Sequence, residues 1–134
     1  MKKYLLDTNI CIFFLRGRFN LKDKIEKIGF NNCFISEITL AELKYGAEFS
    51  DNPTKNIKIV KDFQKEFQLI PIYGAISTYA KEKARLRREG SLIDDFDLLI
   101  GATAVANNMI MVTNNRSHLD RISMIEIEDW TIMS

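Results

Sequence analysis

Short runs of apolar residues recur along this chain, separated by longer stretches whose apolar positions repeat at helical spacing. The runs occupy residues 4–6, 33–35, 69–72, 109–112 and 125–127. The first four contain little polar alternation, a pattern typical of parallel strands that are covered on both faces. Pro71 cannot donate a backbone hydrogen bond, so we expect the third strand to be short or to lie at an edge of the sheet.

Helical patterns fill the intervals between these runs. We predict helices over residues 9–15, 20–28, 73–89 and 94–108, one that starts at Asn52-Pro53, and one that starts near Ser36. For this last helix Thr39 is an alternative cap, because Glu42 follows it at the spacing of a capping box. Strands that alternate with helices indicate right-handed βαβ units. The pattern therefore predicts one α/β domain over residues 1–134, with a parallel sheet of about five strands flanked by helices.

Composition narrows the class of protein without indicating an activity. The 134 residues suit one domain, and 46% hydrophobic with 28% charged residues is typical of soluble globular proteins. No apolar run approaches the roughly 18–20 residues of a membrane span, and no signal peptide is recognisable, so we expect a cytoplasmic protein without a membrane partner. Cys11 and Cys33 are too few for a disulfide framework and are predicted to be small buried hydrophobes. With a net charge of +1, a polyanion would have to meet a local basic patch or a metal.

The first apolar run ends in an acid. Asp7 directly follows Tyr4-Leu5-Leu6, at the position where open α/β sheets place ligand and metal groups. A buried, ionised carboxylate there needs a counter-ion or several hydrogen bonds. Asp is also a common N-cap residue. From this segment alone, a metal ligand and a helix cap stay equally open.

Two later segments carry acids that could meet Asp7. Glu42 has apolar neighbours and is expected near the inward face of its helix, with a capping or solvated role as the alternative. Asp94 and Asp97 share a helix face, and ordinary N-terminal capping also explains Asp94. Asp97 directly precedes the small, apolar stretch 98–104. Asp97 is therefore the stronger candidate for a site in this segment.

Several carboxylates from distant segments suit a hard divalent cation such as Mg²⁺. A cation held in this way lowers the pKa of water and neutralises charge on a phosphodiester. Thr113 and Asn115 follow the fourth apolar run and offer neutral oxygens, although Asn-Asn also favours a plain turn. The sequence lacks the glycine loops of P-loop and dinucleotide enzymes. Its one histidine, His118, is expected to be a surface or structural residue.

Four motifs in chain order resemble those of the PIN-domain ribonucleases, specifically the VapC-type toxins of bacterial toxin–antitoxin pairs. The motifs are Leu6-Asp7-Thr8-Asn9, Ser36-Glu37-Ile38-Thr39-Leu40-Ala41-Glu42-Leu43 with Gly46, Asp97-Leu98-Leu99-Ile100-Gly101-Ala102, and Val112-Thr113-Asn114-Asn115 with His118-Leu119. The ending Glu128-Asp129-Trp130 is also typical. The resemblance covers nearly the whole chain, and the length agrees.

This resemblance implies a PIN-like domain with five parallel strands and acids gathered at their C-terminal ends. It implies Mg²⁺- or Mn²⁺-dependent endoribonuclease activity, with Asp7, Glu42 and Asp97 as catalytic residues and Asp7 and Asp97 as first metal ligands. It also implies an RNA substrate, a VapB-type antitoxin as partner, and a homodimer. Residues expected to assist the site are Thr8, Asn9, Asp94, Thr113 and Asn115. Many relatives carry an acid at the position of Asn115, so a second metal stays open, although Asp94 could compensate.

Two other functions stay open from the sequence. Asp7 could be the nucleophile of a phosphohydrolase, although such enzymes usually carry a second Asp two residues on, where this chain has Asn9. The chain could also be a non-catalytic module that binds RNA or protein and has a degenerate site. The presence of Asp7, Glu42 and Asp97 argues against a degenerate site, whereas Asn115 keeps this alternative open.

Two sets of side chains are candidates for partner contacts. The basic stretch 81–88 could meet an RNA backbone, since Lys81, Arg85 and Arg88 share one helix face; ion pairing with Glu82 and Glu89 is the alternative. Aromatic residues of the early helices could form an antitoxin groove, but core packing explains aromatic residues more often. They are Phe13, Phe14, Phe19 and Tyr45.

Overall fold

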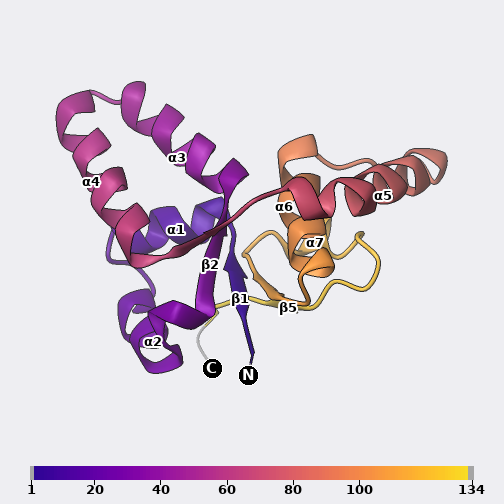
Figure 1. The fold of residues 1–134 in the computed structure, drawn as a ribbon, viewed down its shortest axis with the longest axis horizontal. Helices are drawn as coiled ribbons and strands as arrows, with labels where there is room; N and C mark the ends of the chain where they lie inside the picture. Colours follow the sequence, from indigo (N-terminus) through magenta and orange to yellow (C-terminus); the bar gives the residue numbers. More distant parts are fainter. Residues whose placement is uncertain (1, 133–134) are drawn as a thin grey trace.

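The fold is built on one parallel sheet, which the computed structural model describes within residues 2–132. Its strands pair in the order β3-β2-β1-β4-β5, so β1 lies at the centre (Figure 1). The bounds are β1 Tyr4–Leu6, β2 Cys33–Ser36, β3 Gln68–Ile70, β4 Ile110–Val112 and β5 Ile127–Glu128. The predicted parallel sheet of five strands is confirmed.

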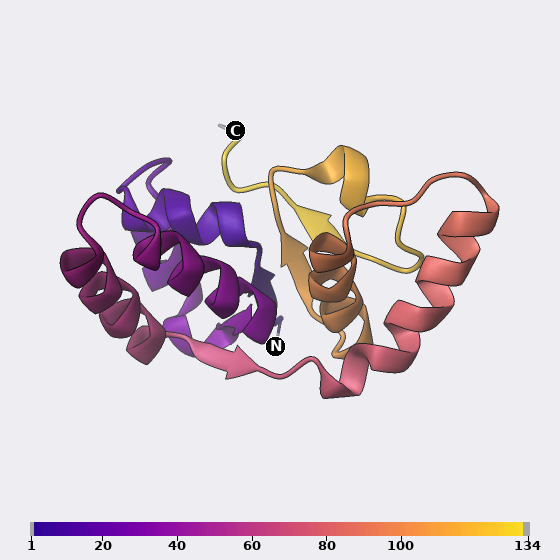
Figure 2. The ribbon, with the colours of Figure 1, turned by 90° about the horizontal axis from the view of Figure 1, so that it is seen from above.

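Helices cover both faces of this sheet. One group is α1 Thr8–Leu15, α2 Leu21–Ile28, α3 Glu37–Glu48 and α4 Pro53–Glu66. The other is α5 Ile76–Arg88, α6 Asp95–Ala106 and the short α7 Arg116–Leu119. The two groups lie on opposite sides of the strands (Figures 1 and 2). Single 3₁₀ turns, Phe30–Asn32 and Tyr73–Ala75, precede β2 and α5.

Successive strand residues point to alternate sides and so divide the core in two. Leu6 and Val112 pack with the side chains of α1 to α4, whereas Leu5 and Met111 pack with those of α5 to α7. This alternation follows from the two-residue repeat of a strand. Because both faces are covered, the strands need apolar residues at every position, which explains their uninterrupted apolar runs.

Side-chain caps set the start of α3 and of α6. Ser36 Oγ accepts a hydrogen bond from the Ile38 amide at 3.0 Å, and Asp94 Oδ2 accepts one from the Phe96 amide at 3.1 Å. The capping role expected as the alternative for Asp94 is therefore confirmed. Thr39 as a cap is wrong, because Ser36 already occupies that position and Thr39 lies fully buried inside α3.

Other predicted boundaries shift by small amounts. The third strand ends at Ile70, before Pro71, and lies at the edge of the sheet as expected. The helix predicted over 73–89 begins as a 3₁₀ turn and continues as α5, which ends before Gly90 with φ +68°. The last strand begins at Ile127 rather than at residue 125. The four residues of α7 are too few to show a helical repeat, so the sequence does not predict this helix.

The two cysteines behave as predicted. Cys11 and Cys33 are both free and fully buried, and both belong to the core cluster on the α1–α4 side. They act as small apolar side chains there. Within residues 2–132, no helix combines the length and the apolar character that a bilayer crossing requires.

Candidate active site

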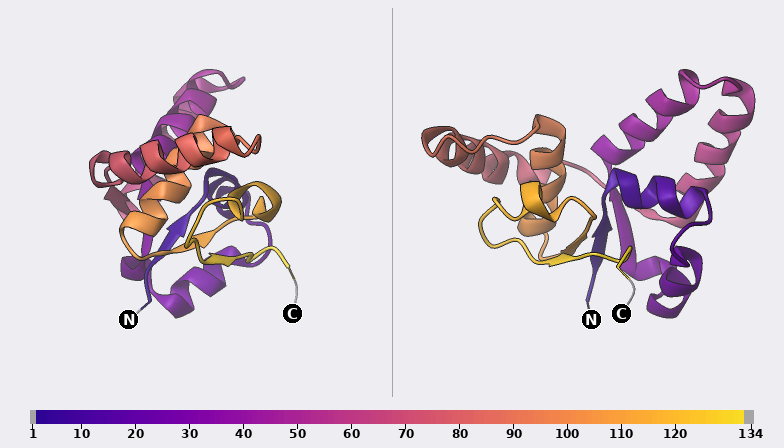
Figure 3. Two further views of the ribbon diagram at one scale, coloured as in Figure 1. Left: turned by 90° about the vertical axis from the view of Figure 1, so that its right-hand side faces the viewer. Right: turned by 180° about the vertical axis from the view of Figure 1, so that it is seen from behind.

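Neighbouring parallel strands deliver the candidate residues to one edge of the sheet. β1 pairs with β2 on one side and with β4 on the other, all in parallel. Asp7, the cap Ser36 of α3 and Thr113 are respectively the residue after β1, the last of β2 and the residue after β4. Figure 3 shows β1 running from the end of the molecule where the chain starts toward α1. The C-terminal ends of parallel strands are the usual place for ligand groups.

Asp7 is a buried carboxylate whose two oxygens both accept hydrogen bonds. Oδ1 accepts the Thr8 amide and Oδ2 accepts the Thr113 hydroxyl, each at 2.8 Å. The side chain is 4% exposed. Burial raises the pKa of Asp7, and the hydrogen bonds from Thr113 and Thr8 offset part of that rise. Asp7 thus caps α1 and faces the site as well, so the two readings of its role are not exclusive.

Glu42 is held by a hydroxyl from another element. Thr8 Oγ1 lies 2.6 Å from Glu42 Oε1 and 3.0 Å from Thr39 Oγ1. Glu42 is the sixth residue of α3 and half-buried, so it does not cap this helix. The expectation that it lies near the border of the inward face is confirmed.

Asp97 stands among the other acids. Its pKa is raised to about 6, first by burial and then by the negative charges of Asp7, Asp94 and Glu42. His118 acts in the opposite sense and lowers the pKa of Asp97. The structure therefore brings the four predicted acids into one region. His118 is exposed, as expected, but its closeness to Asp97 is a feature that the sequence reading missed.

Of the neutral residues expected to assist, Thr8 and Thr113 make direct contacts with the acids. Thr113 Oγ1 donates to Asp7 and also accepts the Asn115 amide at 2.9 Å, which places Asn115 one hydrogen bond further out. Asn9 is exposed in the first turn of α1 and does not join this network within the part of the chain described. Asn115 thus contacts the acids only through Thr113 in the described part of the chain.

The donor set suits a hard divalent cation in charge and chemistry. All groups are oxygens, and among residues 2–132 no Lys or Arg forms an ion pair with Asp7, Glu42, Asp94 or Asp97. A buried carboxylate and a crowd of like charges are costly until a cation neutralises them. In the same region of the chain, however, no three His, Cys, Asp or Glu side chains converge as metal ligands.

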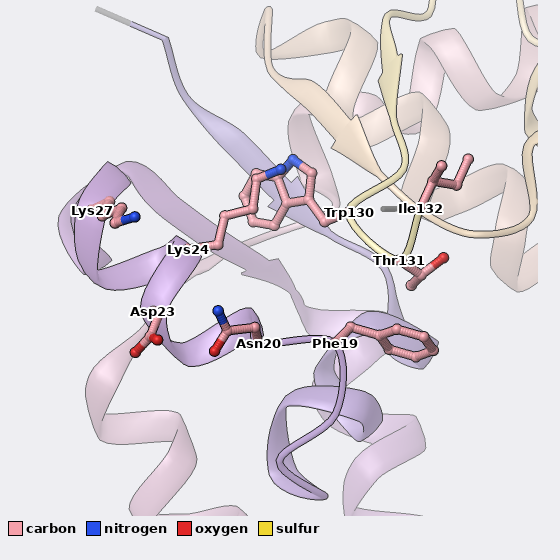
Figure 4. Close-up of a pocket in the computed structure, with 8 residues that line it drawn as sticks. All are labelled: Phe19, Asn20, Asp23, Lys24, Lys27, Trp130, Thr131 and Ile132. Atoms are coloured by element: carbon pink, nitrogen blue, oxygen red, sulfur yellow. The ribbon is translucent and has the colours of Figure 1, made fainter. Parts of the chain in front are cut away.

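The structure contains a cavity away from the candidate acids and a groove beside Glu42. A cavity of about 590 Å³ lies between α2 and the C-terminal segment and contains none of the predicted site residues (Figure 4). Trp130 there is 4% exposed, because Lys24 lies over its ring at 5.3 Å and Tyr4 packs on it at 5.2 Å. A groove of about 340 Å³ borders Glu42 instead; its lining includes Ile12, Arg16, Glu42, Gly46 and Ile59.

Comparison with known proteins decides the family. The family model described as "PIN domain" matches residues 4–123, which contain every predicted site residue. The chain belongs to the PIN domain family. A PIN-domain relative, the tRNA(fMet)-specific endonuclease VapC of Shigella flexneri, is 34% identical over 98% of this chain and 100% of that protein. The resemblance read from the four motifs is thus confirmed.

Solved structures of VapBC complexes contain chains with the same PIN fold. The DNA-bound VapBC from Salmonella typhimurium matches with a TM-score of 0.89 and 33% identity, covering 97% of this chain and 99% of that one. VapBC2 from Rickettsia felis bound to a DNA fragment from the promoter matches with a TM-score of 0.87 and 32% identity, over 95% and 98% of the two chains.

The side chains predicted to contact partners differ in how far other residues of this PIN domain already engage them. Arg85 pairs with Glu82 and Glu89 at 2.9 and 2.8 Å, and Lys83 pairs with Asp95 at 2.8 Å. The expected pairing with Glu82 and Glu89 is therefore confirmed for Arg85, whereas Lys83 pairs with a different acid. Among the aromatic residues, Phe14 packs in the core against the rings of Phe30, Phe63 and Phe67. Tyr45 is 68% exposed and stacks on the exposed ring of Phe49.

Proposed function

We propose that this protein is the toxin of a VapBC-type pair and an endoribonuclease that cuts RNA by hydrolysis at the acid cluster. The carrying observation is the buried Asp7, held by Thr113, together with Asp97, whose pKa is raised by burial and by the neighbouring acids. Perturbed carboxylates gathered at one edge of a sheet are typical of functional sites. VapC ribonucleases as relatives over nearly the full length support the same function.

The proposal assigns Asp7 and Asp97 as ligands of Mg²⁺ or Mn²⁺, with Glu42 as a further ligand or as the group that orients the attacking water. A cation bound there would lower the pKa of that water and neutralise charge on the scissile phosphodiester. Thr113 keeps Asp7 aligned, and Thr8 occupies Oε1 of Glu42. Oε2 of Glu42 thereby stays available to accept a hydrogen bond from that water. Asp94 and Asn115 would support the site from its rim.

A VapB-type antitoxin is the proposed partner, and the groove beside Glu42 is its proposed binding site. The groove combines apolar side chains with Arg16 and adjoins the site, and the exposed Tyr45–Phe49 pair extends α3 as an apolar surface. Such grooves accept an amphipathic helix. VapBC complexes among the solved structures support the pairing. A single domain over residues 1–134, a homodimer and a cytoplasmic location complete the proposal.

Cleavage of a mixed RNA pool by the purified protein tests the activity. We expect cleavage with Mg²⁺ or Mn²⁺, none with EDTA, and at least about a hundredfold loss in Asp7→Asn and Asp97→Asn. Asp62→Asn is the matched control, since Asp62 is exposed on α4 and pairs only with lysines. Full cleavage by both site variants would contradict the assignment. A phosphoryl group trapped on Asp7 would favour the phosphohydrolase instead.

Binding of the cognate antitoxin tests the groove. Ile59 is 38% exposed in the groove, so Ile59→Lys places a charge where an apolar contact is proposed. We expect the Kd for the antitoxin to rise about tenfold or more, as the loss of an apolar anchor does at interfaces. Lys65→Glu on the same helix is the control, because Lys65 is exposed outside the groove. An unchanged Kd in Ile59→Lys would place the antitoxin elsewhere.

A further inference from the structure

We propose that Thr39 is a positioning residue for Glu42 and acts on it through Thr8. This inference rests on the proposed function, because it assigns Glu42 a part in RNA cleavage. Thr39 is the third residue of α3 and fully buried, so it reaches neither RNA nor a cation. Its Oγ1 lies 3.0 Å from Thr8 Oγ1, which lies 2.6 Å from Glu42 Oε1. The three side chains form a continuous chain from the core to the site.

The direction of the hydrogen bonds follows from the number of protons. An ionised carboxylate only accepts hydrogen bonds, and a hydroxyl group carries one proton. Thr8 must therefore donate its proton to Glu42 Oε1. With that proton used, Thr8 Oγ1 can only accept from Thr39. The Thr39 hydroxyl is thus the donor that begins the chain.

Thr103 is a second buried helical threonine, and its hydroxyl makes a different contact. Thr103 is equally buried in α6, and its hydroxyl donates to the Leu99 carbonyl of the preceding turn at 2.7 Å. Threonine inside a helix commonly makes that bond. Thr39 instead directs its hydroxyl to a side chain of a different helix, 31 positions away in sequence. Its hydroxyl therefore contacts a residue of α1 rather than a carbonyl of its own helix.

The consequence for Glu42 is a fixed direction. Thr8 is only partly buried, so water competes for its hydroxyl group. A donor from Thr39 holds Thr8 in the rotamer that points at Glu42 and strengthens the outer bond, since linked hydrogen bonds polarise one another. Without it, Glu42 is free to turn into the adjacent groove, which it also lines. Thr39 therefore holds Glu42 in the orientation in which its Oε1 accepts the Thr8 hydroxyl.

Steady-state cleavage of an RNA oligonucleotide at saturating Mg²⁺ tests this role in the full chain. We expect Thr39→Val to lower kcat about tenfold, with KM for RNA changed less than about twofold, because support residues cost about 10–100-fold. Thr39→Ser, which keeps the hydroxyl, should recover kcat to within about threefold of the wild type. Thr103→Val removes an equally buried hydroxyl in α6 and should leave kcat and KM unchanged. If Thr39→Val does not fold, Thr39→Ala compared with Thr39→Ser answers the same question.

A second readout without RNA or metal tests the link itself. In EDTA, urea unfolding of Thr8→Val, Thr39→Val and the double variant forms a mutant cycle. We expect the midpoint shift of the double variant to be smaller than the sum of the single shifts. Additive shifts, or a wild-type kcat in a folded Thr39→Val, would overturn the inference while the ribonuclease proposal stands. If the wild-type protein fails to cleave RNA, both proposals are overturned.

Discussion

Thr113 Oγ1 donates a hydrogen bond to Asp7 Oδ2 at 2.8 Å, joining residues 106 positions apart in sequence. The pairing of β1 with β4 produces this contact. Leu6 lies opposite Val112 in the parallel register, and the Asp7 amide donates to the Val112 carbonyl at 2.9 Å. The residues that follow both strands are therefore side by side, each almost fully buried. The orientation of the first candidate ligand thus depends on a neutral residue from the other half of the chain.

Thr113→Val should lower RNA cleavage by about 10–100-fold, the usual cost of losing a residue that supports a metal ligand. The change keeps the shape of the side chain and removes the donor to Oδ2. Asp7 then keeps only the Thr8 amide, and its pKa is expected to rise further. Cleavage rate and Mn²⁺ affinity measure the effect. Thr113→Ser is the control and should retain most of both; equal activity in the valine variant would contradict the prediction.

Asp97→Asn should stabilise the metal-free protein above a pH of about 6 and have no such effect below 3.8. The folded-state pKa of about 6 exceeds the ordinary value of 3.8. Between these values the folded protein binds more protons than the unfolded chain, so stability falls as the pH rises through that window. The neutral amide removes the cost of burying a negative charge beside the other acids. Urea unfolding in EDTA at several pH values measures the change in the free energy of unfolding, and Asp62→Asn is the exposed control. A change of the same size at every pH would contradict the prediction.

Gly46→Ala and Gly101→Ala should change stability in opposite directions. A Cβ at Gly46 in α3 meets no atom within 4 Å, so alanine should stabilise this helix by up to about 1 kcal/mol through its better propensity. A Cβ at Gly101 in α6 would collide with Ile122 and approach Leu119 at 3.4 Å. Ile122 is buried and has little room to move, so a loss of about 1–3 kcal/mol is expected.

The free energy of unfolding, measured in urea, separates these two outcomes. Each glycine serves as the control for the other, because both lie inside helices and both changes add the same methyl group. Destabilisation of equal size at the two positions would contradict the prediction. It would show that neither helix propensity at Gly46 nor the close approach of Gly101 to residues 119–125 decides the effect of the added methyl group. Circular dichroism of both variants checks that the helices persist.

Glu82→Gln should destabilise the protein by about 1–3 kcal/mol, because the amide nitrogen would face Arg85 Nε, which Oε2 now accepts at 3.2 Å, and would leave that donor unsatisfied. Glu82 Oε1 accepts Arg85 Nη2 at 2.9 Å and the Ser123 amide at 2.6 Å, which ties α5 to the turn at residues 121–123. The pKa of Glu82 lies below its usual 4.5, chiefly because of Arg85. The folded protein therefore binds fewer protons than the unfolded chain near that pH, and this stabilisation is lost as the pH falls below 4.5.

Urea unfolding at neutral and at acid pH measures this contribution. In the variant, the part of the acid destabilisation that belongs to Glu82 should disappear. Asp62→Asn is the control, because the Lys58–Asp62 pair is exposed and should contribute less than about 1 kcal/mol. Equal losses of unfolding free energy in Glu82→Gln and Asp62→Asn would show that the hydrogen bonds from α5 to the turn stabilise the protein no more than an exposed ion pair does.

Local sequence was sufficient to predict the strands, every helix except the short α7, and the candidate acids. Uninterrupted apolar runs indicate parallel strands because both faces of the sheet are covered, and that requirement is met in the two halves of the core. Pro71 correctly predicts a short edge strand, since it lacks the amide that a ladder needs. Asp7, Glu42 and Asp97 stand out because acids beside apolar runs are rare without a charge partner. All of these signals lie within a few residues of the position they describe.

The contacts among those residues depend on the order of the strands. With β1 between β2 and β4, Asp7 meets Thr113 from one neighbour, while Thr8 meets Thr39 and Glu42 from the helix after the other. No periodic pattern encodes a pairing over 31 or 106 positions, since periodicity reports only which face of an element is buried. The approach of His118 to Asp97 and the burial of Thr39 have the same origin. The sequence thus names the acids, and the packing of distant elements orients them.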